Sequence, residues 1–204
     1  MDNNNNNKDF EEMLCDVRKS FRLLHQYNER VLDLMRYIGS QFGAVAGGYP
    51  HASGPCPKGG KGIERWAWDW LNMHFYEFHF ANAAVPFSVM LQSDTGTYDS
   101  NVDWNDIPNF DEVTKAQTRL IFISSSNPDE YWEFGEMLED GDIMYKNLTG
   151  KGKVVKAEDS EEKMYLMAFN LVDFADKASI DKTLQKWLKF LNDNGETQLT
   201  LHES

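Results

Sequence analysis

The sequence predicts an α+β protein: a mainly antiparallel sheet of about four strands, with a long N-terminal helix, one inserted helix and a C-terminal helix packed on it. Three observations predict this class. Apolar residues recur at spacings of three and four near both ends of the chain, which is the period of a helix. Short stretches between them alternate in side-chain type or are apolar throughout, as strands are. The links between those stretches are short, which favours antiparallel pairing.

Length and composition indicate one globular domain. The chain has 204 residues, of which 41% are hydrophobic. We expect a disordered asparagine-rich tail at residues 1–8, a single domain at 9–195 and a flexible tail at 196–204. Two cysteines are too few for a disulfide framework, the N-terminus lacks a secretory pattern, and no apolar run approaches the ~20 residues of a membrane helix. These features predict a cytoplasmic protein without a membrane partner.

The N-terminal helix is predicted by an apolar stripe whose spacings alternate between four and three, a heptad pattern. Its members are Phe10, Leu14, Val17, Phe21, Leu24, Asn28, Val31, Met35, Ile38 and Phe42. Two interpretations stay open: the stripe packs on a broad core, or it forms a homodimer through the N-terminal helix. Asn28 is its one polar member, and in a parallel dimer this amide would meet its own counterpart.

The segment "ERWAWDWLNMHFYEFHF", residues 64–80, is rich in aromatic side chains, and its part from Trp70 to Phe80 is predicted to be a buried inner strand. From Trp70 onward the residues of both parities are largely apolar, as in a strand covered on both faces. His74 and His79 have opposite parity, so one straight strand cannot direct both to one metal. Glu77 and His79 share a face of this strand, where a buried carboxylate would be unusual, because a charged group is rarely buried without a partner. Another interpretation is a small-ligand pocket lined by His74, Tyr76 and the Trp cluster.

The remaining elements follow from local patterns, and the glycine- and proline-rich segment 43–62 is predicted to be a loop. The predicted strands are "VPFSVMLQS" (a hairpin partner of the aromatic strand), "TRLIFISSS", "GKVVK" and "KMYLMAFNLV". Asn127 is predicted to cap the inserted helix, which Gly141 ends. The last helix is predicted to begin at about Asp176 and to end at Gly195.

Charge is concentrated in one quarter of the chain. The formal net charge is −13, from 20 basic and 33 acidic residues. Between Asp94 and Asp142 thirteen acidic residues face only Lys115 and Arg119. Nucleic-acid-binding proteins usually carry the opposite sign because they must neutralise phosphates, so we expect no nucleic acid as substrate. An acidic face suits solubility or a cationic protein partner.

The acidic side of the inserted helix is the predicted binding site. It consists of Asp129, Glu133, Glu136 and Asp140, at spacings of four, three and four. Like charges at these spacings destabilise an isolated helix, so local stability gives no reason for the arrangement. The sequence therefore predicts a non-catalytic acidic interaction protein of the immunity, inhibitor or regulatory type that binds a cationic protein partner and needs no cofactor.

A metal-dependent hydrolase or nuclease is the alternative. Pro128-Asp129 followed by Glu161-Glu162-Lys163 resembles the short signature of many metal-dependent nucleases. The resemblance implies that the carboxylates of Asp129 and Glu161 hold a divalent cation, while Lys163 helps to position the attacking water. This alternative assigns Asp129, Glu161 and Lys163 as catalytic residues.

A second candidate for a divalent cation site lies in the acidic loop. Asp99, Asn101 and Asp103 place oxygen ligands at every second residue, as in the first half of a calcium-binding loop. The second half fails, because Trp104 stands where a glycine makes the turn and Phe110 where a bidentate glutamate belongs. An EF-hand is excluded, and a looser cation site remains as the alternative.

Overall fold

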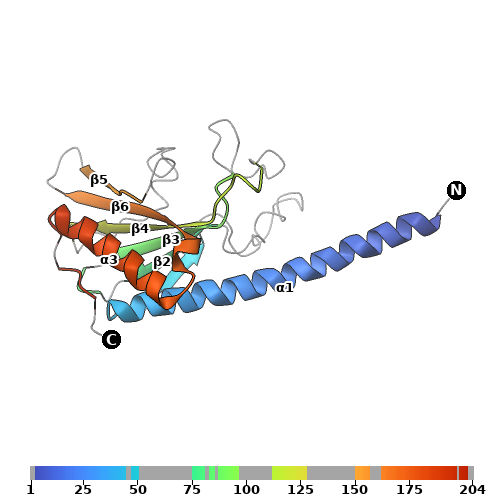
Figure 1. Ribbon diagram of the computed structural model, residues 1–204, viewed down its shortest axis with the longest axis horizontal. Helices are drawn as coiled ribbons and strands as arrows, with labels where there is room; N and C mark the ends of the chain where they lie inside the picture. The colour runs from blue at the N-terminus through green and yellow to red at the C-terminus, as the bar shows by residue number, and fades with distance from the viewer. Residues whose placement is uncertain are drawn as a thin grey trace, which may run out of the picture. The chain divides into compact units, whose positions relative to one another are not determined.

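The computed structural model describes residues 3–44, 47–50, 75–80, 83–85, 87–96, 112–127, 150–156, 162–196 and 198–201. Contacts between Cα atoms divide the chain into two compact units, Met1–Tyr37 and Ile38–Ser204. The sequence predicted one domain over residues 9–195, whereas the boundary between the two units falls inside the first helix. The second unit contains the sheet (Figure 1).

The first helix, α1, spans Asn3–Gln41. It begins within the asparagine run, where the sequence predicted a disordered tail. Gly43 has a φ of 64° and follows the last turn, and the amide of Ala44 donates to the carbonyl oxygen of Gly39 at 2.8 Å. A residue with positive φ just beyond a helix satisfies its last carbonyl groups and ends it.

The sheet has six strands in the order β1-β2-β3-β4-β6-β5, and every neighbouring pair is antiparallel. The strands are β1 (Gly47–Pro50), β2 (Phe75–Phe80), β3 (Phe87–Gln92), β4 (Arg119–Ser125), β5 (Lys153–Lys156) and β6 (Lys163–Asn170). The α+β class and the antiparallel pairing are confirmed, but the expectation of about four strands was too low. The strand that the sequence did not predict is β1, which lies in the glycine- and proline-rich segment; its pairing with β2 stabilises a sequence of low strand propensity.

One face of the sheet carries most of the aromatic core. The register places Phe78, Val89, Phe122 and Met167 in one row across four strands. Because paired residues point to the same side of a sheet, these residues share a face. The ring of Phe122 lies 5.7 Å from that of Trp187 in the last helix.

The last helix, α3, spans Lys177–Asp193 and lies across this face (Figure 1). Its start is capped by Asp176, whose Oδ1 accepts a hydrogen bond from the amide of Ser179 at 2.8 Å. Gly195, with a φ of 97°, follows its end. Both limits agree with the sequence-based prediction. A short 3-10 helix, η6 (Leu171–Phe174), connects β6 to α3.

Two further expectations concern the remaining helix and the C-terminal tail. The predicted inserted helix, from Asn127 to Gly141, lies outside the described residues apart from Asn127 itself. In the predicted flexible tail, Leu199 is buried and the side chain of Glu196 accepts a hydrogen bond from the amide of Gln198 at 2.9 Å. The tail therefore continues the folded structure at least through these residues.

Candidate functional site

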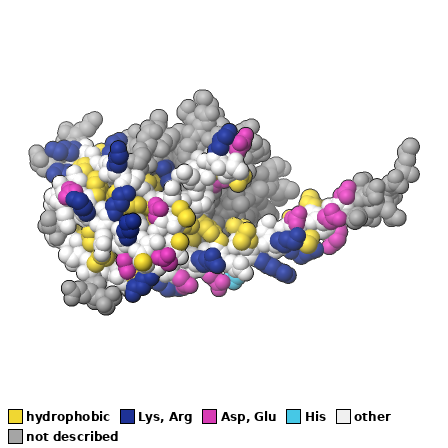
Figure 2. Space-filling view, in the orientation of Figure 1, with side chains coloured by type: hydrophobic (Ala, Val, Ile, Leu, Met, Phe, Trp, Pro, Cys, Tyr) yellow, Lys and Arg dark blue, Asp and Glu magenta, His cyan; other side chains and the backbone are white. Residues whose placement is uncertain are grey.

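The N-terminal half of α1 carries an exposed apolar stripe. Phe10 is 57% exposed and Phe21 is 70% exposed, and Met13, Val17 and Leu24 are also exposed. Figure 2 displays such hydrophobic side chains among charged ones along the helix. A single exposed apolar residue is ordinary, but a contiguous apolar patch marks an interaction surface. We call the residues Phe10, Leu14, Val17, Phe21 and Leu24, together with Met13 beside them, the α1 stripe.

Charges of both signs border the α1 stripe. The Nη2 of Arg18 lies 2.9 Å from Oε1 of Glu11, one heptad earlier on the same side of the helix. This hydrogen bond to Glu11 raises the pKa of the Arg18 guanidinium. On the side of α1 that faces away from the stripe, Nζ of Lys19 lies 2.9 Å from Oδ1 of Asp16. Both pairs are exposed, so each contributes little to the stability of the single chain.

The exposed part of the stripe ends at Asn28. The next members of the heptad pattern, Val31 and Met35, are buried. The Oδ1 atom of Asn28 is itself buried and has no hydrogen-bond partner within the described structure. The heptad pattern is therefore continuous in the sequence, whereas its exposure changes at this residue.

A buried polar cluster lies on the other face of the sheet. Nδ1 of His79 lies 3.1 Å from the hydroxyl oxygen of Ser88 and 3.8 Å from Oε1 of Glu77. Glu77 is fully buried, and Ser88 is buried as well. The prediction that Glu77 and His79 share a buried face is confirmed. Ser88 and Glu77 approach the same ring nitrogen, whereas a catalytic triad uses both nitrogens of its histidine, so this cluster is not such a triad.

A second buried polar contact lies on the same face. Nε of Arg119 donates to Oε1 of Gln92 at 2.7 Å, and the two residues are opposite each other in the β3–β4 pair. Both side chains are buried. A buried guanidinium that is held by a hydrogen bond stabilises a unique register, because a one-residue slip would separate the pair.

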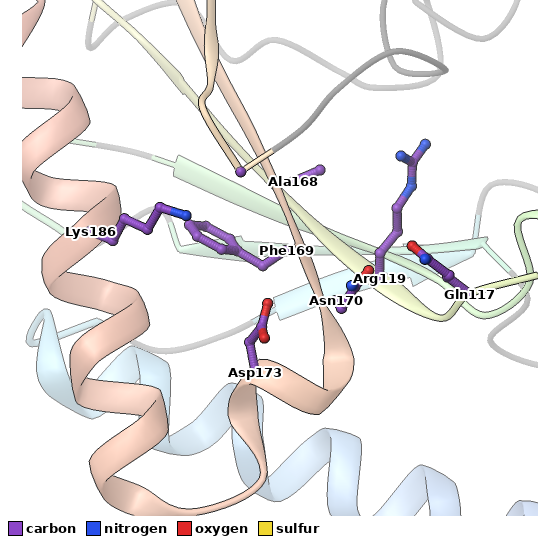
Figure 3. A pocket seen from close by; sticks show the side chains of 8 residues that line it. Gln117, Arg119, Ala168, Phe169, Asn170, Asp173 and Lys186 are labelled. Atoms are coloured by element: carbon purple, nitrogen blue, oxygen red, sulfur yellow. The ribbon is translucent and has the colours of Figure 1, made fainter.

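A small cavity of about 250 Å³ opens where β4 begins and β6 ends. Its lining residues are Gln117, Arg119, Gly150, Ala168, Phe169, Asn170, Asp173 and Lys186. Figure 3 shows Lys186 beside the ring of Phe169, with Arg119 on the other side of β6. The Nζ of Lys186 lies 5.5 Å from the centre of that ring. The cavity is smaller than the usual ligand site of about 300–1,000 Å³, and its two cations point from opposite faces of the strand rather than converging.

Most of the residues predicted as sites fall outside the described structure. They are Asp99, Asn101, Asp103, Asp129, Glu133, Glu136, Asp140 and Glu161, and His74 and the Trp cluster are also outside. Lys163 is described and is the first residue of β6. Its amide donates to the hydroxyl of Ser126 at 2.9 Å, and its carbonyl oxygen accepts from the amide of Ser126 at 2.8 Å. The backbone of Lys163 thus helps to start the strand.

Two general properties concern the described residues alone. Within them, no group of three or more His, Cys, Asp or Glu side chains is placed so that it could hold a metal ion. None of the helices found there combines the length and apolar character that a membrane span requires.

These elements define an α+β protein with an N-terminal helix that exposes an apolar stripe, a six-stranded antiparallel sheet and a C-terminal helix packed on one face of that sheet. The chain belongs to the PM0109 family, whose model matches residues 7–196. Comparisons with curated proteins and with solved structures found no match.

Sequence reasoning missed Ser88 and the cavity, for different reasons. Ser88 could have been found, because the short hairpin between the two predicted strands places it opposite His79. The cavity could not, because Gln117, Asn170 and Lys186 are far apart in the chain and meet only through the sheet and α3.

Proposed function

We propose that this protein is a non-catalytic interaction protein and that the α1 stripe is its principal protein-binding surface. The observation that supports this function is the exposure of Phe10 and Phe21 within a heptad pattern. A helix that presents apolar residues at these spacings is suited to pack against another helix or in an apolar groove.

Site-specific photo-crosslinking in the producing cell tests this function. We expect that a photoreactive phenylalanine analogue at Phe21 forms a covalent protein adduct, whereas the same analogue at Arg22 does not. Arg22 is the matched control because it is the next residue and is exposed outside the stripe. Absence of any protein adduct at Phe21 would contradict the proposed function. The mass of the adduct identifies the partner.

A cationic protein partner for the acidic segment is a second candidate function. Its support is the concentration of thirteen acidic residues between Asp94 and Asp142. Asp129, Glu133, Glu136 and Asp140 in this segment lie outside the described residues, so the docking face stays a prediction from the sequence. The nuclease alternative with Asp129, Glu161 and Lys163 likewise stays a prediction.

The salt dependence of binding tests the second candidate. An association driven by charge should slow steeply between 0.1 M and 1 M salt, because the Debye length falls from about 10 Å to about 3 Å. Replacing Glu133 and Glu136 by glutamine should weaken the same association without lowering the melting temperature. A protein that keeps every partner after this double replacement does not use the acidic helix for binding.

A further inference from the structure

We propose that two copies of this chain pair antiparallel through the α1 stripe, with Glu11 of each copy opposite Arg18 of the other. This inference rests on the proposed function and names the partner as a second copy of this chain. It follows from the symmetry of the stripe, from the charges beside it and from the two points where its exposed part begins and ends.

The apolar residues are self-complementary in an antiparallel pair. In the heptad, Leu14 and Phe21 occupy position a, and Phe10 and Val17 occupy position d. In an antiparallel pair, each layer of the interface joins a residue at heptad position a of one helix to a residue at heptad position d of the other. When the two helices cross between residues 15 and 16, Phe10 of each copy meets Phe21 of the other, and Leu14 meets Val17. Four layers then bury Phe10, Leu14, Val17 and Phe21 of both copies, and Leu24 lies beyond them, level with Asn7 of the other helix.

The charged residues select this orientation and register. Glu11 and Arg18 both occupy position e, and in an antiparallel pair position e faces position e of the other helix. The same crossing point places Glu11 about 3 Å along the helix axis from Arg18 of the second copy, twice by symmetry, a distance that these long side chains can span. Each Arg18 then lies between two carboxylates, the one that it already contacts at 2.9 Å and that of the other chain. A parallel in-register pair would instead place Arg18 beside Met13 and gain no ion pair.

The limits of the exposed stripe agree with this register. The helix begins at Asn3, and the exposed part of the pattern ends at Asn28. In the proposed register, Asn3 of one copy lies level with Asn28 of the other. The pairing therefore uses only the part of the helix that precedes the buried residues Val31 and Met35. If the antiparallel pair were shifted so that the helices overlap over seven more residues, the two Arg18 side chains would lie beside each other. The overlap would also extend to Met35, which is already buried in the single chain. An Asn28 pair in a parallel dimer is disfavoured because Oδ1 of Asn28 is already buried within one chain.

The apolar area is sufficient for a moderate dimer. An aromatic side chain buries about 150–250 Å² and is the largest contributor here, so the exposed stripe offers on the order of 500 Å² per chain. Two stripes together cover about 1,000 Å², which is at the low end for specific interfaces, so we expect a Kd in the micromolar range.

Spin-label distances in the full-length protein test the orientation. Labels are attached to cysteines introduced at Asp16 or at Gln26, both outside the apolar layers, in a background where the two native cysteines, Cys15 and Cys56, are replaced by serine. In the antiparallel dimer the two Asp16 labels are offset along the helix axis by about 2 Å and the two Gln26 labels by about 30 Å, at 1.5 Å per residue. A parallel in-register dimer gives no axial offset at either position. Similar distances at both sites would overturn the antiparallel geometry.

Charge reversal tests the contact between Glu11 and Arg18 by sedimentation. Glu11→Arg should weaken the dimer about tenfold, since two like-charge contacts replace two ion pairs. Combining it with Arg18→Glu should restore the wild-type Kd. The matched control, Lys19→Glu, changes an exposed cation on the outer side of the helix and should leave the Kd unchanged. Failure of the double reversal to restore dimerisation would contradict the proposed contact.

The outcomes separate this inference from the proposed function. A purified chain that stays monomeric at about 100 μM, well above a micromolar Kd, removes the dimer. If the photoreactive analogue at Phe21 still captures a different protein in the cell, the interaction function stands and the second-copy partner falls. If neither experiment detects a protein on the stripe, both are wrong.

Discussion

Nδ1 of His79 and the hydroxyl oxygen of Ser88 lie 3.1 Å apart, directly opposite each other across the β2–β3 pair. The contact lies in a buried part of the sheet, and Glu77 adjoins it. In such surroundings a hydrogen bond contributes to stability mainly because its loss leaves a polar atom unsatisfied.

A double-mutant cycle should therefore detect coupling between these two residues. We expect His79→Gln and Ser88→Ala each to lower the free energy of unfolding, and the double variant to lose less than the sum of both by about 0.5–1.5 kcal/mol. Urea denaturation of the four proteins measures this. If the two effects are additive, the contact does not contribute to stability.

Removal of the Trp187 side chain should destabilise the second unit strongly. Trp187 is fully buried, and its ring lies 5.7 Å from that of Phe122. We expect Trp187→Ala to lower the free energy of unfolding by about 3–5 kcal/mol, because it leaves a cavity in the core. Lys189→Ala is the control on the exposed side of the same helix and should leave the melting temperature close to that of the wild type. A stable Trp187→Ala variant would mean that α3 is not anchored by this ring.

Two glycines with positive φ should respond differently to alanine. Gly195 has a φ of 97°, and a Cβ there would meet nothing within 4 Å, so Gly195→Ala adds only backbone strain of about 1–2 kcal/mol. Gly152 has a φ of 76°, and a Cβ there would collide with the ring of Phe190. We expect Gly152→Ala to destabilise the protein more than Gly195→Ala in thermal denaturation. Equal effects would show that the ring of Phe190 moves aside without cost.

The contribution of the Asp176 cap should depend on pH. The hydrogen bond from the backbone amide of Ser179 lowers the pKa of the Asp176 carboxyl below its ordinary value of 3.8. The carboxylate therefore stabilises the fold fully above pH 3.8, and this contribution is lost as the pH falls through the lower folded-state pKa. Asp176→Ala should melt below the wild type at neutral pH, and the difference should shrink in acid.

Asp176→Asn is the matched variant for this experiment. Asparagine keeps an acceptor oxygen at the N-cap but does not titrate. Its melting temperature relative to Asp176→Ala should therefore change little with pH. A difference between wild type and Asp176→Ala that stays constant into acid would contradict the proposed cap.

Much of the fold was predictable because its signals are local. The strands β3, β4 and β6 were predictable because short runs that alternate or are apolar throughout are typical of strands, and the short link after β2 predicted a hairpin. The limits of α3 follow from Asp176, whose side chain accepts a hydrogen bond at the start of the helix, and from Gly195, whose backbone readily adopts the positive φ that follows its end. The pairing of β1 was missed because three of its four residues, two glycines and a proline, disfavour a strand; β1 is stabilised by its pairing with β2.

For the α1 stripe too, one property could be predicted from the sequence and another could not. The sequence by itself determined the heptad pattern of α1, since the spacing from Phe10 to Phe42 follows from side-chain type and helical period alone. It did not determine that Phe21 is exposed while Met35 is buried, because the two occupy the same heptad position and have similar polarity. Only the tertiary structure decided that difference, since burial depends on which other parts of the chain come near a residue in space.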